Sequence, residues 1–540
     1  MLKKYVYAFE EGKKEMKSLL GGKGANLAEM SKIGLPVPPG FTITTEACIH
    51  YIEIGEVLED SLKESIFEHL EDLEEKIGKK FGDVNDPLLV SVRSGAVISM
   101  PGMMDTILNL GLNDKSVEGL AKKTSNPRFA YDSYRRLIQM FGNVVLGIPG
   151  YEFDNYLERK KDKKDYDNDT DLTVDDLKDI IKDFKALIKN RKDIEFPQKP
   201  EEQLLMAVKA VFSSWNNNRA ISYRNHNDIP HDLGTAVNVQ TMVFGNIGEN
   251  SGTGVAFTRN PATGENKVFG EFLLNAQGED VVAGIRTPKD ISQLNDLMPE
   301  VYEEFMEVTE TLEHHYKDMQ DIEFTIQEGD LFLLQTRTGK RTADAAVNIA
   351  VDMEEEGLID KETAVTRIDP EDISQLLHPN FKEEELEKAD LLAQGLAASP
   401  GAATGKVYFT SEAAAGAAED GEEVILVRKE TSPEDIEGMV KSNGILTSRG
   451  GMTSHAAVVA RGMGKCCVAG AGDIQVDESS KQFFVNDRVF NEGDYISLNG
   501  STGEVYAGVV ETTDAHLTDN FKMLMDWSDE FRELGVYTNA

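Results

Sequence analysis

Residues 446–462 read LTSRGGMTSHAAVVARG, which combines a strand end, a glycine turn and a helix start. Gly450 and Gly451 let the backbone bend where a Cβ would clash, and Thr453 or Ser454 can cap the Ala/Val-rich helix that follows. His455 then lies at the helix start, where unpaired N–H groups and the helix dipole favour a phosphoryl group and disfavour imidazolium. A neutral histidine is a competent nucleophile. The local chemistry leaves two interpretations open, a phosphate-carrying histidine and an ordinary buried one.

Size, charge and cysteine content limit the class of protein. A chain of 540 residues predicts three or four folding units of about 100 to 200 residues each. With 56 Lys and Arg against 95 Asp and Glu, the net charge of −39 argues against nucleic acids and anionic membranes as partners. Cys48, Cys466 and Cys467 are too few for a disulfide framework or a zinc site. We find no signal-peptide pattern and no run of about 18 apolar residues, so we expect a cytoplasmic protein.

The pattern of strands and helices changes along the chain. From residue 21 to about 339 short strands alternate with helices, and a charged segment at residues 159–183 predicts a solvated helical insertion. Residues 341–395 are helical and acidic in pattern and predict a connector of helices. A helical stretch is also expected after residue 511.

The segment between residues 399 and 508 predicts a compact unit. Apolar runs indicate strands at residues 424–427 and 444–446, and Ser432 with Pro433 marks a helix start between them. The adjacent Cys466 and Cys467 fall in a strand pattern that places their thiols on opposite faces. Two similar tetrapeptides predict edge strands near the two ends of this unit, at residues 405–408 and 503–506.

Residues 321–337 read DIEFTIQEGDLFLLQTR, an alternation that predicts a β-hairpin. A three-residue loop at residues 328–330 is required if one buried face is to hold Ile322, Phe324, Ile326, Phe332 and Leu334. This register places Glu323 opposite Gln335 and Asp321 opposite Arg337, with all four on the other face. Carboxylates suit Mg²⁺ and a guanidinium forks onto phosphate oxygens, so this face could hold Mg²⁺ and a triphosphate. The alternative is a surface hairpin with cross-strand polar pairs.

Residues 21–30 read GGKGANLAEM, a glycine loop with a lysine and a helix start, which suits anion binding. The spacing is not that of a Walker P-loop, and an ordinary glycine-rich helix entry is the alternative. Arg93 follows an apolar strand pattern, and residues 99–106 then form a loop with a glycine hinge and an apolar tip. Such a loop could close over phosphates and exclude water.

Residues 450–464, GGMTSHAAVVARGMG, resemble the phosphohistidine signature of the pyruvate phosphate dikinase family. Members of that family interconvert ATP, phosphate and pyruvate with AMP, pyrophosphate and phosphoenolpyruvate. The resemblance extends from residue 1 to about 535. The hairpin at residues 321–337 resembles the metal and phosphate wall of an ATP-grasp domain, and residues 237–243 resemble the hinge that holds adenine.

The resemblance implies a set of site residues. His455 would be the catalytic residue, and Thr453 matches a threonine that regulators phosphorylate in plant relatives. Asp321, Glu323 and Gln335 would bind Mg²⁺ together with ATP. The implied nucleotide and phosphate site, in which the cationic residues neutralise phosphate charge, comprises Lys23, Arg93, Met103, Gln240, Met242, Thr253, Glu279, Asp321, Glu323, Gln335 and Arg337.

The implied fold class is α/β and α+β multidomain. Residues 1–340 would form an ATP-grasp nucleotide-binding domain with a helical insertion at about 112–200, and residues 341–395 a helical linker. Residues 396–510 would form a swivelling β/β/α phosphohistidine domain. Residues 511–540 would begin a linker to a C-terminal barrel that the sequence lacks.

The resemblance implies the nucleotide half of the family's reaction. ATP, phosphate and the histidine would give AMP, pyrophosphate and a phosphohistidine, whose phosphoryl group is destined for pyruvate to form phosphoenolpyruvate. The full reaction is not expected without the barrel, which also forms the family's homodimer contact, so this chain could be a monomer. One alternative is a phosphoenolpyruvate synthase, a water dikinase whose motif usually has Arg and Cys where this chain has Met452 and Ser454. The other is a non-catalytic phosphocarrier or interaction module.

Overall fold

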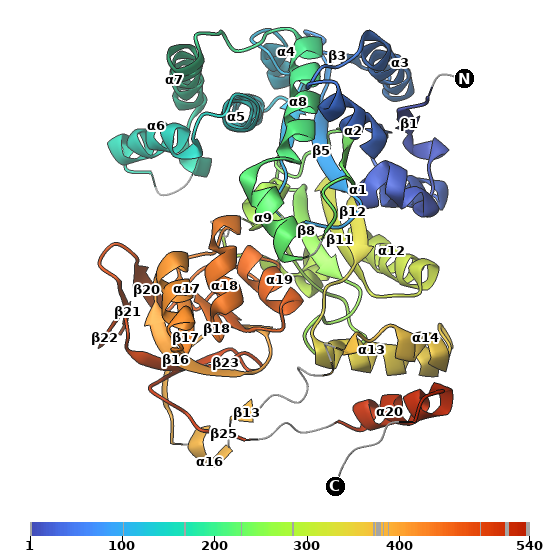
Figure 1. The fold of residues 1–540 in the computed structure, drawn as a ribbon. Coiled ribbons are helices and arrows are strands. Elements are labelled where there is room, and N and C mark those ends of the chain that lie inside the picture. The colour runs from blue at the N-terminus through green and yellow to red at the C-terminus, as the bar shows by residue number, and fades with distance from the viewer. Residues whose placement is uncertain are drawn as a thin grey trace. The chain divides into compact units, whose positions relative to one another are not determined.

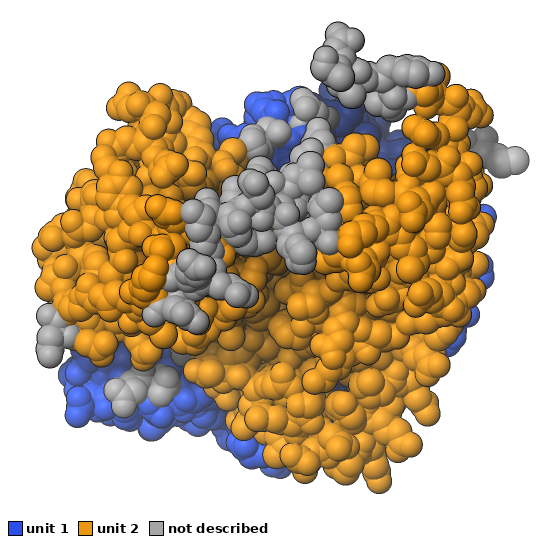
Figure 2. Space-filling model, turned by 90° about the horizontal axis from the view of Figure 1, so that it is seen from below, with its two compact units in different colours: residues 1–252, 324–337 blue, residues 253–323, 338–540 orange. Residues whose placement is uncertain are grey.

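The structure, a computed structural model, describes residues 3–100, 102–166, 169–227, 229–282, 286–370, 373, 380–381, 383–386, 388–486, 488–513 and 518–535. The fold is mixed α/β, and the elements are labelled in Figure 1. The chain divides into two compact units, coloured separately in Figure 2. Unit 1 comprises residues 1–252 and 324–337, and unit 2 comprises residues 253–323 and 338–540.

Unit 1 is built on a five-stranded antiparallel sheet in the order β1-β2-β7-β5-β6. The central strand β7 is buried at six of its seven positions, as expected of a strand covered on both faces. The apolar positions of the neighbouring helices form one core with this sheet. The strands are β1 (Val6–Ala8), β2 (Gly40–Ile43), β5 (Val90–Ala96), β6 (Thr106–Leu110) and β7 (Thr235–Thr241), and the helices around them are α1 (Lys17–Lys32), α2 (Thr45–Glu53), α3 (Asp60–Ile77) and α8 (Pro200–Ser214).

The expected helical insertion is present in unit 1. Asn126 caps the second of its helices by accepting a 3.1 Å hydrogen bond from the Phe129 amide, with Pro127 at the first helical position. The charged run falls on the end of one helix and the start of the next, and Phe153 and Phe184 pack those two helices together with ring centroids 5.0 Å apart. The helices are α4 (Ser116–Lys123), α5 (Pro127–Met140), α6 (Gly150–Lys164) and α7 (Val174–Lys192).

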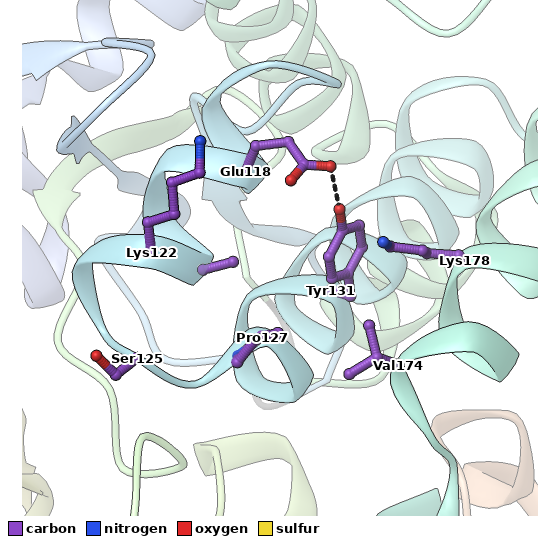
Figure 3. A pocket seen from close by; sticks show the side chains of 8 residues that line it. Glu118, Lys122, Ser125, Pro127, Tyr131, Val174 and Lys178 are labelled. Atoms are coloured by element: carbon purple, nitrogen blue, oxygen red, sulfur yellow. Dashed lines mark hydrogen bonds between the residues drawn. The ribbon is translucent and has the colours of Figure 1, made fainter.

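An open depression of about 580 Å³ lies among α4, α5 and α7 (Figure 3). The Tyr131 hydroxyl donates a hydrogen bond to the Glu118 carboxylate, and the Lys178 ammonium lies 4.6 Å from the Tyr131 ring centroid. None of the residues that line this depression belongs to the expected nucleotide site.

A second five-stranded sheet has the order β10-β9-β8-β11-β12. The turn between β11 and β12 consists only of Glu328 and Gly329, whose φ angles are 54° and 93°. Two consecutive positive φ values are typical of a type I′ hairpin turn. The expected three-residue loop is therefore wrong. The strands are β8 (Gly252–Phe257), β9 (Phe269–Leu274), β10 (Lys289–Asp290), β11 (Gln320–Gln327) and β12 (Asp330–Thr338).

The buried face of this hairpin also differs from the prediction. Leu331 and Leu333 are buried, whereas Phe332 and Leu334 are only half-buried. A two-residue turn shifts the pairing by one residue, which places Leu331 opposite Ile326 and turns the other face of β12 outward. The prediction that Phe332 and Leu334 lie on the buried face of the hairpin is wrong for this reason.

Both strands of the hairpin cross the boundary between the units, after Glu323 and after Arg337. Asp321 and Glu323 therefore belong to unit 2, and Gln335 and Arg337 belong to unit 1. The predicted pairing of Glu323 with Gln335 and of Asp321 with Arg337 required the three-residue loop, so the two-residue turn contradicts it as well.

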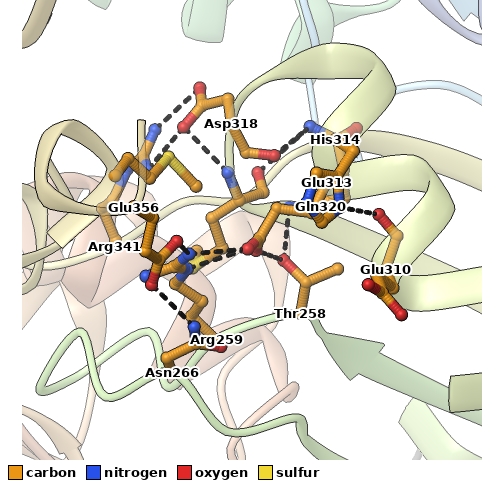
Figure 4. A network of polar contacts seen from close by, with 12 residues as sticks. Thr258, Arg259, Asn266, Glu310, Glu313, His314, Asp318, Gln320, Arg341 and Glu356 are labelled. Atoms are coloured by element: carbon orange, nitrogen blue, oxygen red, sulfur yellow. Dashed lines mark hydrogen bonds and ion pairs between the residues drawn. The ribbon is translucent and has the colours of Figure 1, made fainter. Parts of the chain in front are cut away.

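A buried polar network organises the first part of unit 2 (Figure 4). The Arg259 side chain, which is 0% exposed, donates to Glu313 Oε1 from Nε at 3.0 Å and from Nη2 at 2.8 Å. Glu356 forms a second ion pair with Arg259. Arg341 donates two hydrogen bonds to Asp318, at 2.7 and 3.0 Å. Because breaking a buried ion pair leaves an uncompensated charge, this network fixes the helix that carries Glu313, and the C-terminal end of the helix before Glu356, to the end of β8.

The first part of the segment expected to be helical is helical, and its two helices pack against a helix near the end of the chain through Phe521, Leu524 and Trp527. The helical prediction is wrong for residues 390–394, which form a strand of the eight-stranded sheet. Residues 371–372, 374–379, 382 and 387 of the connector lie outside the described residues. Within the described part of the chain, no helix is both long and apolar enough to cross a membrane. The main helices of unit 2 before its large sheet are α12 (Pro299–Tyr316), α13 (Ala343–Glu355) and α14 (Lys361–Thr366), and the last helix is α20 (Asp519–Phe531).

An eight-stranded sheet forms the second part of unit 2, in the order β14-β24-β23-β16-β17-β18-β19-β15. The four strands from β16 to β19 are parallel, and antiparallel strands flank them on both sides. The strands are β14 (Asp390–Gln394), β15 (Leu396–Ser399), β16 (Ala402–Tyr408), β17 (Val424–Arg428), β18 (Gly444–Thr447), β19 (Cys466–Ala469), β23 (Tyr495–Asn499) and β24 (Glu504–Ala507), and the helices beside them are α17 (Ser411–Glu419), α18 (Ile436–Lys441) and α19 (His455–Gly462).

The structure bears out most local predictions for this sheet. Cys466 and Cys467 point into different apolar clusters, as expected of adjacent strand residues. Ser432 caps the turn that leads into α18, with Pro433 at the first position. The predicted edge strands are wrong. Residues 405–408 lie in the interior strand β16, and residues 503–506 lie in or beside β24, which pairs with β14 and is therefore not at the edge of the sheet.

Candidate functional site

The His455 imidazole projects from the first residue of α19, directly after the turn that follows β18. Gly450 adopts a φ of 105°, which a residue with a Cβ rarely tolerates. Ser454 occupies the N-cap position, but its side chain makes no capping hydrogen bond, and its Oγ atom is buried without a partner. The predicted glycine turn and helix start are confirmed, and the predicted side-chain cap at Ser454 is wrong.

The environment of His455 favours the neutral imidazole. Burial lowers the pKa of His455 to about 4, since a buried site disfavours the charged form. Nδ1 lies 3.0 Å from the hydroxyl oxygen of Thr431. Nε2 is buried and has no hydrogen-bond partner among the residues that the structure describes. One ring nitrogen is therefore fixed by a neighbour, and the other is left with no competing interaction.

Thr431 is a site residue that the sequence analysis missed. It follows β17, and β17 pairs in parallel with β18, in a register that places Arg428 opposite Thr447. Because parallel neighbours end at the same edge of a sheet, the loops after β17 and β18 meet there. The signal available in the sequence was the pair of short apolar strands, each followed by a polar loop.

If His455 accepts a phosphoryl group, as the resemblance implies, Thr431→Val should slow that transfer about tenfold, the size of effect expected when a partner that orients a functional histidine is lost. Valine keeps the shape of threonine but cannot hydrogen-bond to Nδ1. The measurement is the rate at which label from ATP enters the chain. Thr404→Val is the matched control, because the Thr404 hydroxyl pairs with Ser497 in the same sheet. An equal loss in both variants would contradict a specific role for Thr431.

Glu271 on β9 is a second residue that sequence reasoning missed. Its carboxylate accepts hydrogen bonds from the Met452 amide and the Thr453 hydroxyl, and burial raises the pKa of Glu271. A Cβ on Gly451 would lie 2.3 Å from its Oε2 atom. The second glycine of the turn is therefore required by the close approach of this carboxylate.

In unit 1 the structure brings Lys23 and Arg93 to neighbouring elements. Lys23 follows a break in α1 at Gly21, whose φ is 69°. A Cβ on Gly95 would lie 3.5 Å from the Cβ of Lys23, so β5 passes close to the lysine. Arg93 on β5 donates a 3.3 Å hydrogen bond to the Leu334 carbonyl of β12. The predicted glycine break followed by a helix is confirmed.

Three other expected residues of unit 1 are largely engaged in packing. Gln240 is 1% exposed and donates from Nε2 to the Pro38 carbonyl at 3.1 Å. Met103, at the tip of the expected glycine-hinged loop, is 1% exposed and packs with Trp215. Met242 is half-buried against the core.

The expected residues of unit 2 other than His455 lie on or beside the second sheet. Thr253 on β8 is buried, and Glu279 lies on α10 (Gly278–Val282), with its side chain outside what the structure describes. Asp321 and Glu323 are alternate residues of β11, so both lie on one face of the strand. Two carboxylates on one face suit Mg²⁺, which binds oxygen ligands and keeps several waters. No group of three or more His, Cys, Asp or Glu among the described residues forms a metal site by itself.

Comparison with known proteins agrees with this geometry. The profile described as "Pyruvate phosphate dikinase, AMP/ATP-binding domain" matches residues 17–68, 56–301 and 292–358. The profile described as "PEP-utilising enzyme, mobile domain" matches residues 420–503, which include His455 and Thr431.

Relatives match over almost the whole chain. Pyruvate, phosphate dikinase of Clostridium symbiosum is 60% identical over 538 residues, which cover 99% of this chain and 62% of the relative. The chloroplastic pyruvate, phosphate dikinase of Flaveria trinervia is 56% identical over 542 residues, 100% of this chain and 57% of the relative. Pyruvate, phosphate dikinase 2 of Zea mays is 55% identical over 530 residues, 98% of this chain and 60% of the relative. The chain thus spans about three fifths of the length of these relatives.

Proposed function

The chain belongs to the pyruvate phosphate dikinase family, and on that premise we propose that it transfers a phosphoryl group from ATP to His455. In this proposal ATP, phosphate and the histidine give AMP, pyrophosphate and a phosphohistidine, and the phosphoryl group is then passed to pyruvate. The observation that carries the proposal is the state of His455. Its imidazole is neutral at physiological pH, Nδ1 is fixed by Thr431, and Nε2 is unpartnered at the start of a helix.

The nucleotide would bind to an ATP-grasp domain formed by residues 1–340, with the helical insertion at about 112–200. Residues 396–510 would act as the swivelling domain that carries His455, connected through residues 341–395. The matches of the AMP/ATP-binding and mobile-domain profiles to separate stretches of the chain support this division.

His455 would act as the nucleophile. In the tautomer with the proton on Nδ1, the Thr431 hydroxyl oxygen would accept a hydrogen bond from Nδ1–H, which leaves the Nε2 lone pair free to attack the β-phosphorus of ATP. A bond forms between Nε2 and phosphorus, and the bond from that phosphorus to the oxygen it shares with the α-phosphate breaks, so that AMP leaves. Inorganic phosphate then takes the terminal phosphoryl group, which releases pyrophosphate and leaves the β-phosphoryl group on His455.

The remaining site residues would stabilise charge on the phosphates. Lys23, Arg93 and Arg337 supply positive charge, which is the main requirement of phosphoryl transfer. Asp321, Glu323 and Gln335 would hold Mg²⁺. The metal would neutralise phosphate charge and orient the nucleotide when bound.

The test is to follow β-labelled and γ-labelled ATP with and without inorganic phosphate. The proposal predicts that the β-label is retained on the protein. It also predicts that the γ-label appears in pyrophosphate, and that pyrophosphate forms only when inorganic phosphate is present. Release of the γ-label as phosphate with no requirement for added phosphate would instead support the water dikinase. Absence of any label on the protein would support a binding module and contradict the proposal.

The pH dependence of labelling provides a further prediction. With a pKa of about 4, His455 stays unprotonated, so its labelling rate should be constant from about pH 8 to about pH 5.5. An imidazole with an ordinary pKa near 6.5 would lose about tenfold in rate over that range. The folded chain also binds fewer protons at this site than the unfolded chain, so its contribution to stability declines as the pH falls from about 6.5 to about 4. An acid limb with a midpoint near pH 6.5 would contradict the neutral buried histidine.

A further inference from the structure

Arg461 is a buried cation that binds backbone carbonyls. It lies six residues after His455 on α19 and is 3% exposed. Nη2 donates to the Met452 carbonyl at 2.6 Å, and Nη1 donates to the Ala398 carbonyl at 2.9 Å. The guanidinium carbon lies 5.8 Å from the centroid of the Phe257 ring.

The guanidinium remains charged although it is buried. Burial lowers the pKa of Arg461 to about 10, which is still well above neutrality, and the carboxylates of Asp321 and Glu271 act in the opposite direction. Among the described residues no carboxylate lies within ion-pair distance of it. Removing an ion of this kind from water costs several kcal/mol. The two charge-assisted hydrogen bonds to backbone carbonyls offset that cost.

The two carbonyls connect Arg461 to the segments that present His455. Met452 belongs to the turn between Gly450 and Ser454, and Ala398 belongs to β15, which pairs with β19. The side chain therefore joins α19, the turn and the sheet. Ser454 is the N-cap residue, but its side chain does not cap the helix. Arg461 therefore supplies the side-chain restraint on this turn that a capping side chain would otherwise give.

We propose that Arg461 is a positioning residue for His455. Its guanidinium holds the Met452 carbonyl and thereby keeps the turn in the conformation that directs the imidazole. Only the catalytic readout of this inference rests on the proposed phosphoryl transfer. The effect on the turn follows from the hydrogen bonds alone.

The test compares Arg461→Met, which removes the donors, with Arg461→Lys, which keeps the charge and one donor group. In the Met variant the labelling rate at saturating ATP should fall about 100-fold, the loss expected from a misplacement near 1 Å. The ATP concentration for half-maximal rate should change less than about twofold, because no nucleotide contact is removed. The labelling rate of the Lys variant should be about tenfold higher than that of the Met variant. Arg488→Met is the control, since Arg488 is exposed on β22 (Arg488–Asn491), where it forms an ion pair with Asp390 and its guanidinium carbon lies 5.2 Å from the Phe490 ring centroid.

Amide hydrogen exchange at residues 450–454 separates this inference from the proposed function. Exchange should accelerate at least tenfold in Arg461→Met and remain unchanged in Arg488→Met. If Arg461→Met does not fold, the Lys variant decides by the same two measurements. Unchanged labelling and unchanged exchange in a folded Arg461 variant would overturn the positioning role. If the wild-type chain takes no label, the proposed function fails, and the exchange measurement still tests the role of Arg461 in the turn.

Discussion

His455→Gln should abolish the transfer of β-label from ATP to the protein, with a loss of at least about 10⁴-fold. Glutamine is similar in length to histidine, but its amide nitrogen has no available lone pair and cannot form a stable bond to phosphorus. So large an effect is expected because no other side chain accepts phosphorus from ATP in the proposed reaction. AMP release should disappear together with the label, and so should the formation of pyrophosphate from added phosphate, whereas ATP binding should persist because the expected nucleotide contacts lie elsewhere in the chain.

His314→Gln provides the matched control for this experiment. His314 is exposed on α12, and its Nδ1 atom lies 2.8 Å from the Glu310 carbonyl of its own helix. The same substitution at this position should leave labelling unchanged. Persistent labelling of His455→Gln would show that another residue accepts the phosphoryl group.

Gly21→Ala should destabilise the chain by more than about 4 kcal/mol and abolish ATP binding. A Cβ at this position would lie 1.7 Å from the Gly95 carbonyl oxygen, and the φ of 69° is already unfavourable for any residue with a side chain. The Gly95 oxygen and the Gly95 carbonyl carbon, which the Cβ would meet at 1.7 and 2.6 Å, are backbone atoms, so relief requires α1 and β5 to separate. These two elements carry Lys23 and Arg93, so separation also disrupts the expected phosphate contacts.

The neighbouring glycine is the control for this prediction. At Gly22 a Cβ would meet nothing closer than 3.5 Å, and the residue is helical. Gly22→Ala should therefore change the free energy of unfolding by less than about 1 kcal/mol, and in the stabilising direction. Denaturant unfolding and ATP binding measured on both variants test the comparison. Equal stability of the two variants would contradict the close contact between Gly21 and Gly95.

Local sequence signals predicted the elements around the site well. The order of strand, glycine turn and helix around His455 depends on neighbouring residues, and Ser432 with Pro433 marked the helix start beside it. Such features are set by backbone geometry within a few residues, so they can be read from a short stretch of sequence. The family resemblance rested on these same stretches, and the profile matches bear it out.

The contacts that tune His455 could not be read in this way. Thr431 lies 24 residues before the histidine, and it reaches Nδ1 only because β17 and β18 are adjacent and parallel. Glu271 and Arg461 contact the turn through the tertiary fold. Side chains of this kind are positioned by the arrangement of whole elements, for which a single sequence gives little information.

Two of the incorrect local predictions have identifiable physical causes. Glu328 adopts a left-handed conformation in the hairpin turn, which the sequence analysis did not consider for a non-glycine residue, and the register therefore moved by one. Ser454 was expected to cap α19, but its side chain lies against Gly450, where an added Cβ would be 3.0 Å from Ser454 Oγ. Helix-capping residues are preferences of sequence, and packing overrode the preference here.

The central claim is that His455 accepts phosphorus from ATP. The most direct test is to incubate the wild-type chain with Mg²⁺, ATP and phosphate, digest it at alkaline pH, where phosphohistidine survives, and locate the added phosphoryl mass by peptide fragmentation. The account predicts a single phosphoryl group on the His455 imidazole, lost on mild acid treatment. A phosphoryl group on another residue, or a chain that hydrolyses ATP to AMP without carrying one, would contradict it.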